Sequence, residues 1–190
     1  MSLKLITAPA ENPVDSATVK AHLRVIGSSE DSLIAIYTSA ATSALDGPTG
    51  LLGRALVTQT WEYVLDSFPS EWIELPLPPL QSVTSIKYID TAGVEQTLSS
   101  ARYTVDSASD PGGVVVDADG WPETYDTANA VVIRFVCGYG AASAVPAPLK
   151  SAVLLHAGDL FENRQIGSEK QLFSNEAYDR QTYPYRKLGL

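Results

Sequence analysis

Apolar and polar residues alternate between residues 55 and 66, where the chain shows its clearest pattern. One side carries Ala55, Val57, Trp61, Tyr63 and Leu65, and the residues between them are mostly polar. Gln59 is the polar interruption on the apolar side. A period of two is typical of a strand with one buried face. We therefore expect a half-buried strand that places Trp61 in a core.

Further short apolar segments predict that this strand belongs to an antiparallel sheet. They are residues 72–75, 82–89, 94–98, 103–106, 114–116 and 130–136. Pro76, Pro78 and Pro79 interrupt the ladder because proline has no backbone N–H. Residues 90–93, Asp-Thr-Ala-Gly, are typical of a hairpin turn. The last segment is apolar on both faces except at Arg134, which predicts the central strand.

Helical periodicity predicts three helices, at residues 16–24, 30–45 and 149–163. Asp15 or Ser16 is placed to cap the first helix, and Ser29 to cap the second. The apolar stripe of the second helix consists of Leu33, Ile36, Tyr37, Ala40, Ala41 and Ala44. The stripe of the third consists of Leu149, Ala152, Val153, His156, Leu160 and Phe161. Alanine and serine fill the rest of the second helix, so another helix can approach it closely.

The two ends of the chain lack these periodicities. Pro9 and Pro13 keep residues 1–13 out of a helix, and we expect an extended arm there. The predicted fold class is α+β, with a small helical bundle (two N-terminal helices plus one C-terminal helix), an inserted antiparallel β region and an extended C-terminal tail. The predicted divisions are a helical body at 1–53 and 145–164, a β region at 54–144 and a C-terminal arm at 165–190.

Composition adds an expectation about partners. Apolar residues make up 45% of the 190 residues and charged residues only 18%, where about 25% is usual. Low charge favours a surface partly covered by other subunits. The net charge of −9 argues against nucleic acid as the primary partner. Residues 1–161 carry 8 basic and 18 acidic side chains, whereas residues 162–190 carry 5 and 4. The tail is then either an arm that docks on another subunit or a plain disordered terminus.

The cysteine content and the lengths of the apolar segments indicate the cellular compartment. Cys137 is the single cysteine, which excludes an internal disulfide, and its apolar surroundings predict a buried reduced thiol. The first residues lack the apolar core of a signal peptide, and no segment approaches the roughly 18 apolar residues of a membrane span. We expect a soluble chain of the cytosol with no membrane partner.

Acidic residues gather between residues 106 and 126, where no Lys or Arg occurs. They are Asp106, Asp110, Asp117, Asp119, Glu123 and Asp126. Two of these carboxylates could act as the acid and base of a glycosidase. A metal site is a second alternative, since residues 117–120 resemble the start of a calcium loop, but the later ligands of such a loop are missing. Solvated loops are the favoured interpretation. A third interpretation is an acidic wall that faces DNA and repels phosphate.

Other candidate chemistry is weak. His22 and His156 lie on or beside helix stripes and have no zinc partners at ligand spacing. The chain has no nucleophile elbow, no phosphate-binding loop and no dinucleotide fingerprint. Trp61, Trp72 and Trp121 suit either a core or a sugar-stacking platform, and the core is favoured. We therefore predict no catalytic residue, no metal site and no cofactor.

Several short segments follow one another in a specific order and spacing: residues 5–7 (LIT), 13–14 (PV), 19–25 (VKAHLRV), 30–31 (ED), 56–62 (LVTQTWE), 73–80 (IELPLPPL), 82–83 (SV), 135–140 (FVCGYG), 145–150 (VPAPLK) and 162–164 (ENR). In this arrangement the chain resembles, over roughly residues 3–164, the head–tail connector (adaptor) proteins of tailed bacteriophages and gene transfer agents. The combination of segments carries the resemblance, since no single segment is diagnostic.

The resemblance implies a structural virion protein rather than an enzyme. Such proteins form a ring, typically of twelve subunits, under the portal protein after DNA packaging. The ring extends the DNA channel, through which DNA passes without sequence-specific binding, and offers a platform for stopper or tail proteins. In relatives the helices form the ring body and the C-terminal segment reaches the portal. The implied location is the head–tail interface of a virion, with host cytoplasm during assembly.

On this interpretation three groups of residues are candidate contacts. The portal-docking arm would use Phe173, Tyr178, Arg180, Tyr183, Tyr185 and Arg186. Contacts between subunits would use Leu33, Tyr37, Leu149, Val153 and His156. Asp117, Asp119 and Glu123 would form an acidic surface of the DNA channel. The alternatives are a carbohydrate-binding or glycosidase-like β module, suggested by the tryptophans and carboxylates, and another tail-completion protein.

Overall fold

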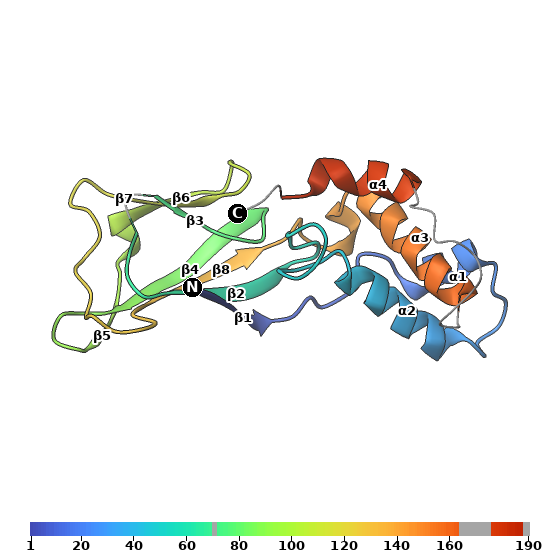
Figure 1. Cartoon of the computed structure of the whole chain (residues 1–190), viewed down its shortest axis with the longest axis horizontal. Helices are drawn as coiled ribbons and strands as arrows, with labels where there is room; N and C mark the ends of the chain where they lie inside the picture. The colour runs from blue at the N-terminus through green and yellow to red at the C-terminus, as the bar shows by residue number, and fades with distance from the viewer. Residues whose placement is uncertain (70–71, 164–175, 188–190) are drawn as a thin grey trace. The chain divides into compact units, whose positions relative to one another are not determined.

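The β region and the helices form two separate units in the computed structural model (Figure 1). The structure describes residues 1–69, 72–163 and 176–187. A sheet unit comprises Met1–Ala10 and Thr58–Tyr139, and a helical unit comprises Glu11–Val57 and Gly140–Leu190. The α+β class with an inserted antiparallel β region is therefore as predicted. The first ten residues correct the expected domain division, because they belong to the sheet unit and not to the helical body.

A five-stranded antiparallel sheet forms the larger part of the sheet unit, in the order β1-β2-β8-β4-β5. Its strands are β1 (Ser2–Thr7), β2 (Gln59–Leu65), β4 (Leu80–Ile89), β5 (Glu95–Thr97) and β8 (Val131–Cys137). The central position of β8 confirms the prediction drawn from its apolar faces. The turn predicted at residues 90–93 joins β4 to β5, where Asp90 accepts hydrogen bonds from the N–H groups of Ala92 and Val94, both at 3.0 Å.

A second, three-stranded antiparallel sheet has the order β3-β7-β6. Its strands are β3 (Trp72–Glu74), β6 (Tyr103–Asp106) and β7 (Gly113–Val116), and the short 3-10 helix η1 (Ser100–Arg102) precedes β6. Gly113 lets the Trp72 ring approach, because a Cβ on Gly113 would lie 2.5 Å from Trp72 Cζ2. Larger residues at this position would separate β3 from β7.

Side chains from both sheets build the core of the sheet unit. Its fully or almost fully buried members include Trp61, Leu65, Ile73, Ile86, Val114, Ile133 and Phe135. Gln59, the interruption in the alternating pattern, is also buried, at 2% exposure. Its Oε1 accepts a hydrogen bond of 2.9 Å from Trp61 Nε1, so each polar group satisfies the other. The buried Cys137 thiol agrees with its prediction.

All three predicted helices are present in the helical unit: α1 (Ser16–Leu23), α2 (Asp31–Ser43) and α3 (Ala147–Glu162). The short 3-10 helix η2 (Ala142–Ala144) precedes α3. Asp15 caps α1 as predicted and accepts a 2.7 Å hydrogen bond from the N–H of Thr18. This bond lowers the pKa of the Asp15 carboxyl. Ser29 does not cap α2, whose N-cap position is occupied by Glu30, and no side-chain capping bond is formed there. Lys20 instead holds the start of α2 through an ion pair of 2.5 Å with Asp31.

The buried face of α2 is rotated from the predicted stripe. Ile34, Thr38 and Ala41 are buried, whereas Ile36 is 63% exposed. Thr38 tolerates burial because its hydroxyl donates a 2.7 Å hydrogen bond to the carbonyl of Ile34. Helix α2 packs against α3 (Figure 1). The two helices bury Ile34, Ala41, Leu149, Ala152, Val153 and Ala157.

Both chain ends contain regular structure where extended segments were expected. Residues of β1 pair with β2, with Leu5 opposite Trp61, and do not form a free arm. Helix α4 (Glu176–Thr182) and the 3-10 helix η3 (Tyr183–Tyr185) occupy part of the expected C-terminal tail, so the bundle gains a fourth helix. Both segments gain their structure from partners far away in the sequence.

Candidate assembly surfaces

The C-terminal segment docks on the helical unit of its own chain. Helix α4 packs against α3, where the Tyr178 ring meets the His156 ring edge-on, with centroids 5.9 Å apart. Burial is the main cause that raises the pKa of the Tyr178 hydroxyl. Thr182 is fully buried, and its hydroxyl donates a 3.0 Å hydrogen bond to the carbonyl of Tyr178. The alternation of buried and exposed positions on α4 therefore follows from its contact with α3.

Two hydrogen bonds fix the segment after α4 to the loop that follows α2. The Arg54 guanidinium, only 9% exposed, donates from Nε to the carbonyl of Tyr185 at 2.5 Å. The N–H of Lys187 donates to the carbonyl of Leu52 at 2.9 Å. Arg186 donates from Nη2 to Asp179 Oδ1 at 2.9 Å. Residues 176–187 are thus held by side-chain packing at one end and by hydrogen bonds at the other.

The contact between α3 and the C-terminal segment has incomplete polar pairing. Among the described residues, three buried side-chain atoms there have no hydrogen-bond partner: His156 Nδ1, Gln181 Oε1 and Arg186 Nε. An unpaired buried polar group usually costs about 1–3 kcal/mol. The free energy that holds the C-terminal segment against α3 is therefore smaller than the buried area alone would give.

The predicted portal-docking residues divide into covered and exposed groups. Tyr178, Tyr185 and Arg186 are partly covered by their own chain. Tyr183 is 63% exposed, and Arg180 is exposed beside Glu176, with which it forms an ion pair of 3.1 Å. Phe173 lies outside the described residues. Among the described members of the group, Tyr183 and Arg180 are consequently the exposed ones while α4 is docked.

The predicted inter-subunit residues also divide. Leu149 and Val153 are fully buried between the helices of their own chain. This corrects their assignment, because side chains without exposed surface cannot contact a neighbouring subunit. Leu33, Tyr37 and His156 are half-buried, and the Tyr37 ring meets Phe161 edge-on at 6.4 Å. A stripe at helical spacing predicts that a face is buried but not which chain covers it.

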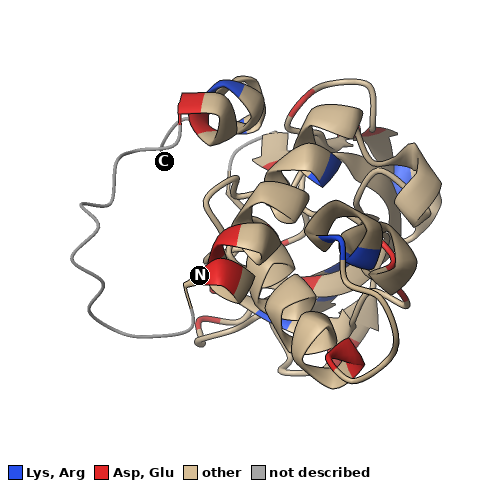
Figure 2. Ribbon diagram, turned by 90° about the vertical axis from the view of Figure 1, so that its right-hand side faces the viewer, with Lys and Arg blue, Asp and Glu red and all other residues tan. Residues whose placement is uncertain are grey.

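The outer face of α2 is an exposed surface that the sequence pattern did not identify. It consists of exposed, uncharged residues: Ser32, Ala35, Ile36, Ser39, Ala40 and Ser43. Asp31 is the one charged residue of this helix. Figure 2 shows the helix ribbons mostly in tan, with few basic or acidic residues. Such a neutral face has little desolvation cost when another chain covers it. The low overall charge was the signal that could have directed attention to it.

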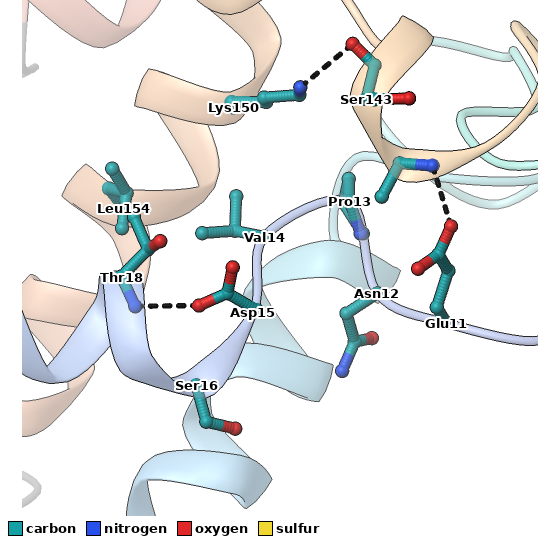
Figure 3. Close-up of a pocket in the computed structure, with 11 residues that line it drawn as sticks. Glu11, Asn12, Pro13, Val14, Asp15, Ser16, Thr18, Ser143, Lys150 and Leu154 are labelled. Atoms are coloured by element: carbon teal, nitrogen blue, oxygen red, sulfur yellow. Dashed lines mark hydrogen bonds between the residues drawn. The ribbon is translucent and has the colours of Figure 1, made fainter.

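A cleft of about 530 Å³ opens at the start of α1 (Figure 3). Its charged side chains are Glu11, Asp15 and Lys150. Glu11 Oε1 accepts a 2.8 Å hydrogen bond from the N–H of Ala142, and Lys150 Nζ donates to the carbonyl of Ser143 at 3.2 Å. Each charged group thus holds a backbone group of the surrounding loops. The printed hydrogen bonds of Glu11, Asp15 and Lys150 all go to backbone groups, so these side chains fix the loops around the cleft.

Of the three residues of the predicted acidic surface, one forms an ion pair and two are exposed. Asp117 accepts a 2.6 Å hydrogen bond from Arg102 Nε, and this guanidinium lowers the pKa of the Asp117 carboxyl. Asp119 and Glu123 are exposed. Arg102 offsets the charge of Asp117, so Asp119 and Glu123 are the predicted residues that remain exposed to solvent as carboxylates.

The tryptophans do not share one platform. Trp61 is a core residue at 8% exposure, whereas Trp72 is 37% exposed. One face of the Trp121 ring stacks on Phe68, with centroids 4.7 Å apart and planes 2° from parallel. A sugar ring would have to use the other face of Trp121 alone, which weakens the carbohydrate-binding interpretation.

Within residues 1–69, 72–163 and 176–187, no group of three or more His, Cys, Asp or Glu side chains is arranged to hold a metal ion. The helices in the same ranges include none that is long and apolar enough to cross a membrane.

Charged residues form a row across the five-stranded sheet, and residues opposite each other in a sheet lie on the same face. Lys4 of β1 lies opposite Glu62 of β2, which lies opposite Arg134 of β8. An ion pair of 2.5 Å joins Arg134 Nη2 to Glu62 Oε1. The row thus begins at β1 with a basic residue and alternates in sign over the first three strands.

The same row continues to the other edge. Lys87 of β4 lies opposite Val132, two residues from Arg134, and opposite Thr97 of β5. Glu95, two residues from Thr97, is therefore on this face too, and Lys87 Nζ pairs with Glu95 Oε1 at 2.8 Å. The row ends at β5 with an acidic residue. The two edges of one face thus carry opposite charges.

Comparison with known proteins gives structural neighbours only. No family model and no curated protein matches the chain. A chain of the neck of an empty gene transfer agent (GTA) particle, computed with C6 symmetry, has a TM-score of 0.80. A chain of the virion of the native GTA particle has 0.79, and one of the native GTA neck, computed with C12 symmetry, has 0.75. Each is 25% identical, and each match covers 100% of this chain and 97% of the other.

These neighbours extend the resemblance found in the sequence. Both units of this chain are shared with chains from GTA particles, since the matches cover its full length. The resemblance to proteins of the phage and gene transfer agent neck is confirmed at this level. Membership of the adaptor family in particular stays a prediction.

Proposed function

We propose that this chain is a structural protein of the neck of a gene transfer agent or tailed phage particle. More specifically, it is a head–tail connector subunit that forms a ring, of twelve copies, between the portal protein and the stopper or tail proteins. The full-length likeness to GTA neck chains, at a TM-score of 0.80, carries the proposal. A non-enzymatic role fits this position, and the assembled particle is the place where the chain acts.

The surfaces of the chain support a role in a ring. The neutral outer face of α2 suits lateral contact with another subunit, because few charges have to lose their water there. The net charge of −9 suits a channel through which DNA slides without sequence-specific contacts. Asp119 and Glu123 are the exposed carboxylates proposed to face it.

The C-terminal segment is proposed to contact the portal from its exposed side. Tyr183 and Arg180 are accessible while Tyr178 and Thr182 hold α4 against α3. The three unpaired polar atoms at that contact support a segment that also gains stability from a second protein. The predicted arm is thus a docked helix with an outward face.

Electron cryomicroscopy of intact particles from cells that produce this chain tests the proposal. We expect a ring between portal and tail whose density fits both units of the chain, with α3 and β8 recognisable. Particles made without the chain should contain packaged heads that lack tails. Density for the chain at the tail tip or within the tail tube would replace the connector proposal with that of a tail-completion protein. A normal yield of complete particles without the chain would contradict both.

A further inference from the structure

Within the described part of the chain, no further strand pairs with either edge of the five-stranded sheet. Among the described residues, β1 pairs only with β2 and β5 pairs only with β4. Leu5 on β1 is 45% exposed, and Val94 beside β5 is 53% exposed. An edge with unpaired N–H and C=O groups and exposed apolar side chains is a template for another strand. A monomer would leave two such edges uncovered.

The two edges are complementary in charge on one face. Lys4 ends the charged row at β1, and Glu95 ends it at β5. Lys4 forms no ion pair within the described residues, and the side chain of Glu95 is 64% exposed although it contacts Lys87. A strand that brings Lys4 next to Glu95 would therefore continue the alternation of charge across a subunit boundary.

We propose that β5 of each copy pairs with β1 of the next copy, so that the sheets of neighbouring subunits join into one. The proposal rests on the ring proposed above and names the contact that closes it. Because the two edges are different surfaces, the contact is heterologous. Contacts of this kind generate rings when the rotation between copies closes.

The number of strands fixes the direction of this pairing. Strands alternate in direction across an antiparallel sheet, so the first and the fifth, β1 and β5, run the same way. Rotation about a ring axis preserves the direction of a strand relative to that axis and to the radius. The β1 strand of the next copy therefore runs parallel to β5. Evenly spaced, slanted hydrogen bonds are expected at this boundary, unlike those elsewhere in the sheet.

The side chains select one register. With Lys4 opposite Glu95, the parallel alignment places Leu3 opposite Val94 and Leu5 opposite Gln96. The exposed Val94 then gains an apolar partner on the opposite face from the charged pair. The pairing of β1 with β2 is regular from Ser2 to Leu5 and shifts before Thr7, so the four regular residues are those that meet β5.

Disulfide cross-linking in assembled particles tests the register. The variant Leu3→Cys with Val94→Cys places two thiols opposite each other across the proposed boundary, and the native Cys137 is buried. We expect a ladder of covalent multimers after mild oxidation. Leu5→Cys with Val94→Cys, displaced by two residues, is the matched control and should give at most traces. Each single variant should give no ladder, because one thiol cannot link successive copies head to tail.

Charge exchange provides a second measurement. Lys4→Glu and Glu95→Lys each place like charges across the boundary, and each should weaken a contact by roughly two- to fivefold. The double variant K4E/E95K restores opposite charges and should recover ring yield above either single variant. Circular dichroism of the free chains separates this effect from misfolding, since Lys4 faces Glu62 and Glu95 pairs with Lys87 inside each copy.

The outcomes separate this contact from the proposed function. Rings that persist in the neck without a ladder from L3C/V94C and without charge rescue would overturn the strand pairing but leave the connector proposal standing. A covalent bond from Leu3→Cys to a different virion protein would overturn it as well. Absence of the chain from the neck would instead contradict the proposed function.

Discussion

The pair formed by Gln59 and Trp61 shows how one polar residue fits into an apolar strand face. The alternation at residues 55–66 predicts the strand, and Gln59 breaks it. In the structure the break is compensated, because the indole N–H donates to the Gln59 amide at 2.9 Å. A polar residue on a core face thus indicates a partner nearby, and here the partner is two residues away on the same strand.

Replacing Trp61 with Phe should lower the free energy of unfolding by about 1–3 kcal/mol, because the buried Gln59 amide loses this donor. Trp72→Phe is the matched control, since the Trp72 ring is 37% exposed and donates no hydrogen bond to the described residues. Denaturant unfolding followed by circular dichroism measures both. Equal losses in the two variants would show that ring size, and not the hydrogen bond, determines the stability of the strand.

The stripe of α2 shows where residue patterns lose accuracy. Apolar spacing placed Ile36 on the buried face, whereas the structure buries Thr38 and exposes Ile36. Thr38 satisfies its hydroxyl within the helix, so its polarity carries little cost inside the bundle. The two faces of α2 are of similar polarity. The sequence of the helix therefore did not determine which of its faces is buried.

At the scale of elements, the periodic segments were predictable, including the short strands β3, β5, β6 and β7, whereas the elements near the two chain ends were not. The three helices and the central strand β8 were placed from their own residues. Strand β1 lacked such a signal, because its pairing partner β2 is more than fifty residues away. Helix α4 has seven residues and is too short to be stable alone, so it depends on contact with α3.

Deleting residues 166–190 removes α4 and should leave a folded chain, because the cores of the sheet unit and of α1 to α3 do not include it. The truncated chain should fail to attach to portal-bearing heads. Tyr183→Ala removes an exposed ring and should reduce attachment with little change in melting temperature. Tyr178→Ala should loosen α4 by about 1 kcal/mol and raise its cleavage by protease.

Attachment assays on purified heads, with melting curves for each variant, separate these effects. Full attachment of both the truncated chain and the Tyr183→Ala chain would contradict the portal-docking role of the segment. Loss of attachment only in Tyr178→Ala would indicate that the docked position of α4, and not its exposed face, matters to the portal.

At the scale of the whole molecule, the inserted β region and the α+β class were predictable from the order of periodic segments. The assignment of faces to partners was not. Leu149 and Val153 look like contact residues in the sequence but are covered by their own chain. The open edges of the sheet arise from strand order, which depends on pairings between distant segments.

The acidic surface leads to a prediction about net charge and its location. Asp119→Asn with Glu123→Gln should increase retention of nonspecific DNA at low salt, because two exposed carboxylates no longer repel phosphate. Asp117 is kept, since its loss would also break the ion pair with Arg102. Asp159→Asn with Glu162→Gln on α3 changes the net charge equally and is the control. Equal retention in both double variants would mean that total charge, and not this surface, repels DNA.

The bond between Arg54 and Tyr185 joins residues 131 positions apart and has a consequence for the order of events during translation. The sheet unit has all its residues once Tyr139 has left the ribosome. The helical unit lacks α3, α4 and the acceptor for Arg54 until Tyr185 has been synthesised. We therefore expect the inserted unit to fold first on the nascent chain, because residues 11–57 pack against α3, which is synthesised later.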